Sequence, residues 1–120
     1  MTITTPPQTR RDLVLEALDL GLHVVADKPF APDAAGGREL AAVADRAGRL
    51  LSVFHNRRWD ADIVTLRALL EAGRLGAVAR FHSRMDLDEF STMEGGPTGG
   101  LLRVLGAHVV DQALWLFGPA

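Results

Sequence analysis

The order of short apolar runs and amphipathic stretches restricts the fold of this chain more than any other feature. Short apolar runs alternate with longer stretches in which apolar residues recur at helical spacing. These segments follow one another at residues 1–4, 8–20, 22–27, 33–47, 50–55 and 61–72. Short apolar runs of this kind are typical of strands that are buried on both faces. The alternation therefore predicts right-handed crossovers, a parallel sheet and an α/β fold.

The pattern changes after residue 76. Residues 77–87 alternate polar and apolar side chains, which predicts a longer strand with one polar face. Residues 88–100 are polar and rich in glycine and indicate a loop, and residues 101–117 form a strongly apolar helical pattern. We place the boundary between the two parts of the chain near residues 57–60, where the α/β alternation ends.

Composition excludes several classes of protein. The chain has 120 residues with a formal net charge of −2, so it lacks the concentrated basic face that nucleic acid binding needs. The absence of cysteine excludes disulfides, thiolate catalysis and cysteine-bound zinc, and the histidines show no metal-ligand spacing. No apolar run approaches the ~20 residues of a membrane span. The N-terminus has no signal-peptide pattern, so we expect a cytoplasmic protein without a metal.

One expected part of a nucleotide-binding sheet is not in the sequence. Such a sheet opens with a strand, a G-x-G-x-x-G turn and a helix. The glycines of "GGPTGG" at residues 95–100 do not follow a strand in this way and are best interpreted as a loop. Since residues 1–4 resemble the tail of a strand, the sequence predicts a fragment that is truncated at both ends.

Four blocks together resemble one family. They are "TPPQT", "GLHVVADKPFA", "VFHNRRWDADIVTLRALLEAGRLG" and "GGLLRVLGAHVVDQALWLFG". In order and spacing they are similar to the glucose–fructose oxidoreductase, inositol dehydrogenase and rhizopine-catabolism family, usually called the Gfo/Idh/MocA family. The resemblance implies an oxidoreductase that uses NAD or NADP and acts on a hydroxyl of a sugar or polyol, with a homo-oligomer in the complete protein.

The same resemblance divides the chain into two parts. It assigns residues 1–58 to the second half of a Rossmann-like parallel sheet. It assigns residues 59–120 to the crossover helix and the start of an α+β domain for substrate binding and oligomerisation. The choice between NAD and NADP stays open, because the residues that contact the ribose belong to a segment that the sequence does not contain.

The resemblance also assigns roles to the first two blocks. The family's lysine after a buried strand binds the substrate hydroxyl and assists proton transfer, and the matching residue is Lys28. An ammonium at that place can stabilise a developing alkoxide. The expected cofactor contacts are Thr5, Pro6, Pro7, Asp27, Lys28, Pro29 and Arg57. Without the other blocks, a simple turn at residues 5–7 and a solvated Lys28 would be the alternatives.

The last block departs from the family pattern. His108 and Asp111 match, but Val104 replaces the aspartate that relatives carry four residues before the histidine. His108 is a candidate general base, and a packed helix histidine is the alternative. Valine cannot orient an imidazole. The resemblance makes Lys28 and His108 the catalytic candidates, and the substrate contacts are expected from Lys28, Asn56, His108 and Asp111.

Two other functions stay open on the sequence. The chain could be an inactive relative that serves in binding or assembly, which Val104 and the missing glycine turn favour. It could also be a truncated gene product without independent activity. In either case we expect the 120 residues alone to be inactive as an enzyme.

Overall fold

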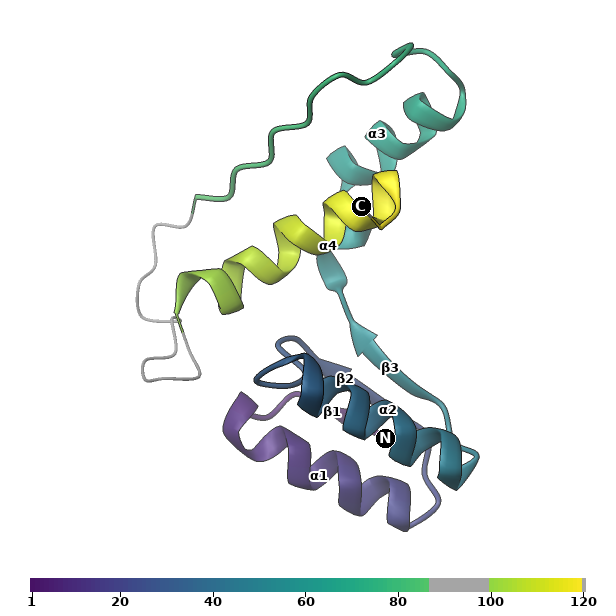
Figure 1. Ribbon diagram of the computed structural model, residues 1–120, viewed down its shortest axis with the longest axis vertical. Coiled ribbons are helices and arrows are strands. Elements are labelled where there is room, and N and C mark those ends of the chain that lie inside the picture. The colour runs from purple at the N-terminus through teal and green to yellow at the C-terminus, as the bar shows by residue number, and fades with distance from the viewer. Residues whose placement is uncertain (87–99, 120) are drawn as a thin grey trace. The chain divides into compact units, whose positions relative to one another are not determined.

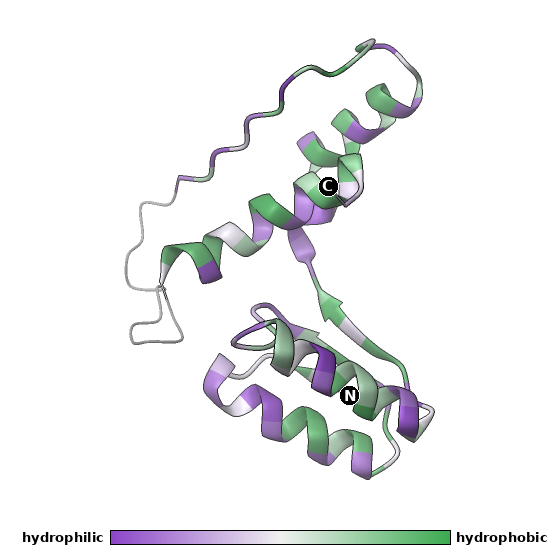
Figure 2. Cartoon of the chain, viewed as in Figure 1, coloured by the Kyte–Doolittle hydropathy of each residue, from purple (hydrophilic) through white to green (hydrophobic). Residues whose placement is uncertain are grey.

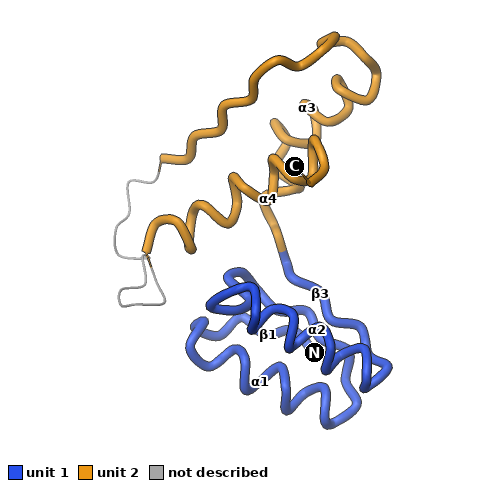
Figure 3. The backbone as a smooth tube through the Cα atoms, in the orientation of Figure 1, with its two compact units in different colours: residues 1–54 blue, residues 55–120 orange. Residues whose placement is uncertain are grey.

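A computed structural model describes residues 1–86 and 100–119 of the chain. The chain consists of two compact units, Met1–Phe54 and His55–Ala120, which Figure 1 and Figure 3 show in one orientation. Each unit is described by itself below.

The first unit is built on a three-stranded parallel sheet. Its strands are β1 (Thr2–Ile3), β2 (Val24–Asp27) and β3 (Leu51–Phe54), in the order β1-β2-β3. Both neighbouring pairs are parallel, and Ala26 is in register with Ile3 on one side and with Val53 on the other. Two crossover helices, α1 (Pro7–Asp19) and α2 (Ala34–Ala47), connect the strands. The predicted α/β fold with a parallel sheet is confirmed.

Local sequence signals explain where the two helices begin and end. Helix α1 has proline at its first positions, where the missing N–H costs no helical hydrogen bond. The Asp33 carboxylate caps α2 by accepting from the Gly36 N–H at 2.8 Å. Gly48 ends α2 in the left-handed conformation with φ 63°, which glycine adopts without a steric penalty. Figure 2 shows hydrophilic and hydrophobic residues alternating along both helices, as expected of helices with one buried side.

The core of this unit lies between the two helices and one face of the sheet. Its largest fully buried side chains are Ile3, Val14, Leu18, Val24 and Leu40. The other face of the sheet remains open, since Val25 is 38% and Phe54 51% exposed. The prediction of strands buried on both faces is therefore wrong for this chain. The reason is topological: two right-handed crossovers that progress in the same direction along a sheet place both helices on the same face.

The second unit is helical. A single 3-10 turn, η1 (Asn56–Trp59), leads into α3 (Ala61–Glu71). Near the C-terminus, a π-helical turn, η3 (Leu102–Gly106), continues directly into α4 (Ala107–Phe117). The rings of Trp59 and Trp115 pack edge to face at 5.9 Å, and the Arg67 guanidinium lies 4.2 Å from the Trp115 ring centroid. The helix that the sequence predicts over 101–117 is confirmed.

The prediction of a strand over residues 77–87 is wrong for the part of that segment that the structure describes. Residues 77–86 have no strand structure. A polar and apolar alternation matches the two faces of a strand, but a strand also needs a neighbour for its backbone hydrogen bonds. No strand occurs elsewhere in the described part of this unit. The glycine-rich loop predicted over 88–100 lies outside the described residues except for Gly100.

None of the helices in the ranges 1–86 and 100–119 combines the length and apolar composition needed to cross a membrane.

Candidate active site

In the first unit, the candidate residues lie on two loops at the same edge of the sheet. Thr5, Pro6 and Pro7 follow β1, and Asp27 ends β2 immediately before Lys28 and Pro29. Because β1 and β2 are adjacent and parallel, the loops after their carboxyl ends emerge side by side. This edge is where open α/β sheets hold their ligands. The structure therefore brings together the first two sets of residues that the sequence singles out.

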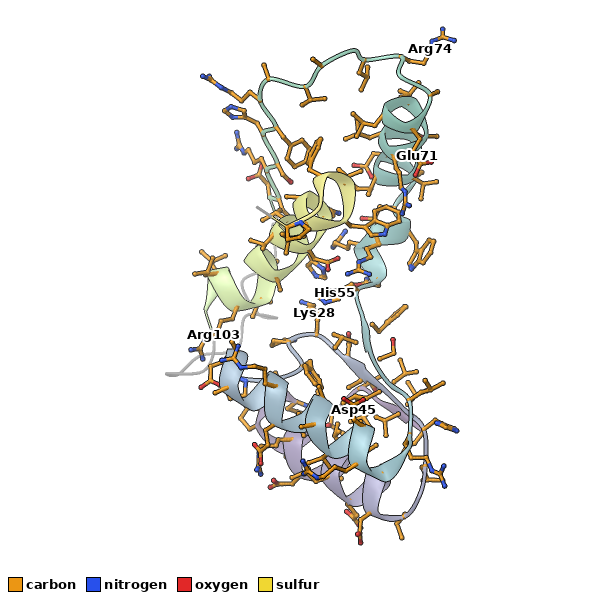
Figure 4. All side chains as sticks on the ribbon, turned by 45° about the vertical axis from the view of Figure 1, so that its right-hand side comes forward. Lys28, Asp45, His55, Glu71, Arg74 and Arg103 are labelled. Carbon is orange, nitrogen blue, oxygen red and sulfur yellow. The ribbon has the colours of Figure 1, made fainter. Side chains whose placement is uncertain are left out.

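The loop after β2 is held close to the strand. The Lys28 backbone N–H donates to the Asp27 carboxylate at 2.8 Å, and the peptide bond between Lys28 and Pro29 is cis. The side chains of Asp27, Lys28 and Pro29 are half-buried. Figure 4 shows Lys28 on this loop.

Arg10 joins the two loops. Its Nη1 donates to the Pro29 carbonyl at 2.5 Å and its Nη2 donates to the Thr5 carbonyl. The residue is only 3% exposed. Arg10 was not predicted from the sequence, although a signal was present: it lies four residues before Val14 and seven before Ala17, on the buried stripe of α1.

In the second unit, the candidate residues are held by contacts between η1 and α4. Arg58 donates to both carboxylate oxygens of Asp111, from Nε at 2.7 Å and from Nη2 at 2.6 Å. The His55 Nε2 lies 3.6 Å from Asp111 Oδ1. The Gln112 side-chain amide donates to the Arg57 carbonyl at 3.0 Å. These contacts, across more than fifty positions in sequence, fix the turn after β3 against the last helix of the unit.

The charge arrangement fits a strong ion pair. The hydrogen bond with Asp111 raises the pKa of Arg58 above its ordinary value, and its partial burial opposes this effect. Asp111 is buried, so its carboxylate depends on the guanidinium to replace lost hydration. The ion pair of Arg58 with Asp111 and the approach of His55 to the same carboxylate were not predicted from the sequence.

The other candidates of this unit lie in different surroundings. His108 is buried on α4, one turn before Asp111, and Val104 lies in η3 one turn before His108. Asn56 is exposed. Arg57 pairs with Asp60 at 3.2 Å and lines an open cavity of about 420 Å³. Besides Arg57, the cavity is lined by residues such as Asp60, Ile63, Phe81 and Gln112.

The residues present fit part of a dinucleotide site. The paired loops after β1 and β2 supply the sheet edge at which such a ligand lies, while the glycine-rich turn that holds its pyrophosphate is not in the sequence. Within the described ranges, no three His, Asp or Glu side chains come together as metal ligands.

Comparison with known proteins identifies the family. Residues 1–55 match the model of the oxidoreductase family with an NAD-binding Rossmann fold, and residues 63–120 match the GFO/IDH/MocA C-terminal domain. The oxidoreductase YdgJ of Escherichia coli is 46% identical over 98% of this chain and 36% of its own length. The scyllo-inositol 2-dehydrogenase (NADP(+)) IolW of Bacillus subtilis is 36% identical over 97% of this chain and 34% of its own length.

Solved structures agree with these sequence matches. The crystal structure of an oxidoreductase from Bacillus cereus is 29% identical, with a TM-score of 0.87, over 98% of this chain and 34% of its own. The chain thus spans about a third of the length of the curated relatives it matches. The chain belongs to the Gfo/Idh/MocA family of NAD(P)-binding oxidoreductases.

Proposed function

We propose that this chain is the part of an NAD(P)-dependent oxidoreductase that presents a catalytic lysine to a hydroxyl of a sugar or polyol. The observation that carries the proposal is the position of Lys28, which directly follows β2 at the sheet edge, on a loop joined to the Thr5–Pro7 turn through Arg10. The names of relatives support this substrate class, since IolW is a scyllo-inositol dehydrogenase.

Each candidate residue has a chemical task in this proposal. When bound, the nicotinamide cofactor supplies the hydride acceptor. Lys28 donates a hydrogen bond to the substrate oxygen, where negative charge develops as the hydride leaves. His108 accepts the hydroxyl proton at its imidazole. Cofactor contacts are proposed for Thr5, Pro6, Pro7, Asp27, Lys28, Pro29 and Arg57.

The remaining substrate contacts are proposed for Asn56 and Asp111. Asn56 is exposed and therefore accessible to a ligand. Both carboxylate oxygens of Asp111 already accept from Arg58, so a substrate hydroxyl would share an oxygen with the guanidinium. Carboxylate oxygens have enough lone pairs for such sharing.

The wider assignments belong to the same proposal. Residues 1–58 serve as the second half of the dinucleotide-binding domain, and residues 59–120 begin the substrate domain. We propose a cytoplasmic homo-oligomer for the complete protein. The direct test is an assay of a full-length oxidoreductase that carries this chain, with NAD and NADP and a panel of cyclic polyols and sugars. Reduced-cofactor fluorescence above the no-substrate background supports the proposal, and its absence on every substrate contradicts it.

One observation favours a second function, that of an inactive relative used in binding or assembly. Val104 lies one turn before His108 and offers no carboxylate to orient the imidazole. An inactive relative would bind NAD or NADP in the same assay without turnover. The two functions are therefore separated by cofactor binding measured alongside activity.

The 120-residue chain alone is expected not to bind NAD or NADP with micromolar affinity. Its sequence contains no G-x-G-x-x-G turn, and that turn holds the pyrophosphate on a helix N-terminus. Isothermal titration calorimetry with each cofactor measures this directly. Micromolar binding to either one would mean that the described loops hold the phosphates without a glycine-rich turn.

His108→Asn in the full-length oxidoreductase is expected to lower kcat by about 10²-fold or less. General acid–base catalysis contributes roughly 10²–10⁴ in rate. The lower end is expected because position 104 carries valine where the family pattern has an aspartate. Steady-state kinetics measure the loss, with His82→Asn as the matched control because His82 is exposed. An unchanged kcat would make His108 a packing residue of α4.

A further inference from the structure

Arg10 is buried more deeply than any other charged side chain in the part of the chain that the structure describes. It is 3% exposed, whereas Asp111 is 9% exposed. Removing a guanidinium from water is costly unless good hydrogen bonds replace its hydration. Hydrogen bonds from Arg10 to the Pro29 and Thr5 carbonyls supply such replacement inside the unit.

Those contacts join two loops that the sequence keeps apart. The two terminal nitrogens of the guanidinium donate to the Pro29 and Thr5 carbonyls, which lie 19 and 5 positions away in sequence. A guanidinium is planar and its donors have a fixed fork geometry. The separation of the two carbonyls is therefore set by the shape of one side chain.

The two bonded carbonyls flank the candidate site. Thr5 opens the turn that leads into α1, and Pro29 is bonded directly to Lys28. Movement of the Pro29 carbonyl would carry the Lys28 backbone with it. The neighbouring Arg11 gives a contrast, because its side chain is 43% exposed and pairs with Glu39 on the surface at 2.6 Å.

We propose that Arg10 is a positioning residue, which sets the place of Lys28 relative to the Thr5–Pro7 turn by bonding the carbonyls of Thr5 and Pro29. This inference rests on the proposed function for its catalytic consequence, but its structural part concerns the two loops alone. Arg10→Lys keeps the positive charge but removes the two guanidinium donors. A single ammonium cannot reproduce two donors with fixed spacing.

The structural part is tested on the 120-residue chain. Lys28 is the single lysine of the unmodified sequence, whereas Arg10→Lys and Arg11→Lys each add a second one. A combined ¹³C-aspartate and ¹⁵N-lysine label therefore selects the Lys28 amide, because Lys28 follows Asp27 and neither introduced lysine follows an aspartate. Arg10→Lys is expected to speed hydrogen exchange of the Lys28 amide by about tenfold through local opening. Arg11→Lys, the matched control, is expected to leave that exchange unchanged. The Val24 amide, which is buried and donates to the Leu50 carbonyl at 2.8 Å, reports global unfolding when followed with a valine label and should exchange as in the unmodified chain.

The catalytic part is tested in the full-length oxidoreductase. Arg10→Lys is expected to lower kcat by about 10- to 100-fold, because small misplacements of a reacting group carry costs of this size. Arg10→Ala should lower kcat by as much. Ethylguanidine added to the assay should restore part of the turnover of Arg10→Ala. Simple destabilisation would give no such rescue. Arg11→Lys should retain the kcat of the unmodified enzyme, since exposed ion pairs contribute little.

The outcomes separate this inference from the proposed function. Unchanged exchange at Lys28 in Arg10→Lys overturns the positioning role, and so does an equal rise in the exchange rates of Lys28 and Val24, which would indicate global destabilisation. An unmodified enzyme without turnover overturns the proposed function, and the exchange data then decide the loop-positioning role alone. Faster exchange confined to Lys28, together with an unchanged kcat in Arg10→Lys, overturns the catalytic role proposed for Arg10.

Discussion

Lys28→Met in a full-length oxidoreductase that carries this chain is expected to lower kcat by about 10²–10³. The substitution keeps the length of the side chain and removes its charge. The ammonium acts on the substrate oxygen, where negative charge grows during hydride transfer, and a preorganised donor at such a place contributes about 3–4 kcal/mol. The loss should appear in kcat, because the interaction is stronger in the transition state than with bound substrate.

Measurements of kcat and of the cofactor Kd, together with one control variant, test this prediction. The Kd for NAD or NADP, measured by fluorescence in parallel, should change far less than kcat. Lys28→Arg keeps a cation on the half-buried loop after β2 and should recover part of the lost rate. Turnover that survives in Lys28→Met while only cofactor binding weakens would show that Lys28 is a cofactor contact and not the catalytic residue.

Arg58→Met is expected to destabilise the second unit by about 2–3 kcal/mol. Breaking a buried pair by removal of one partner typically costs about 3–5 kcal/mol, since the remaining charge stays buried without compensation. The expected value is smaller here because the Arg58 side chain is 36% exposed and water can partly replace it. The physical loss is the double hydrogen bond to Asp111, which joins η1 to α4.

The tryptophans make this experiment specific to one unit. The chain has two, Trp59 and Trp115, and both lie within residues 55–120, where their rings pack together. Urea unfolding followed by tryptophan fluorescence therefore reports on the second unit. Arg84→Met is the matched control, because Arg84 and its partner Asp86 are 85% and 69% exposed. That control should cost about 0.5 kcal/mol or less.

A double-mutant cycle completes the test. Asp111→Leu together with Arg58→Met removes both charges, so the double variant should be more stable than the sum of the two single losses predicts. An equal loss in the free energy of unfolding for Arg58→Met and Arg84→Met would mean that the pair of Arg58 with Asp111 does not stabilise the second unit.

Sequence patterns were sufficient for most of the elements of the first unit. The helices α1 and α2 follow from apolar spacing and from end signals such as Pro7, Asp33 and Gly48, which act within a few residues. The parallel sheet follows from the alternation of strands and helices, because such crossovers leave few topologies. Lys28 at a strand end was identified from the resemblance of its block to one family.

The strand prediction over 77–87 marks where such patterns stop being sufficient. Alternation describes the two faces that a segment offers, whereas strand structure depends on a partner for its backbone groups. For residues 77–86 the described part of the second unit holds no such partner. Burial of the sheet was mispredicted for a related reason, because Val25 and Phe54 are apolar but both helices cover the opposite face.

The sequence by itself determined the helices, the parallel strands of the first unit and the family, because helix periodicity, caps and motif spacing are local properties of the chain. Only the tertiary structure decided that Arg10 bonds the carbonyls of Thr5 and Pro29 and that Arg58 binds Asp111, 53 positions away. The sequence alone does not distinguish an arginine that lies in water from one that lies in a core. Its partners are chosen by which backbone and side-chain atoms the folded chain places within hydrogen-bond distance, since a cation that leaves water needs acceptors at that distance.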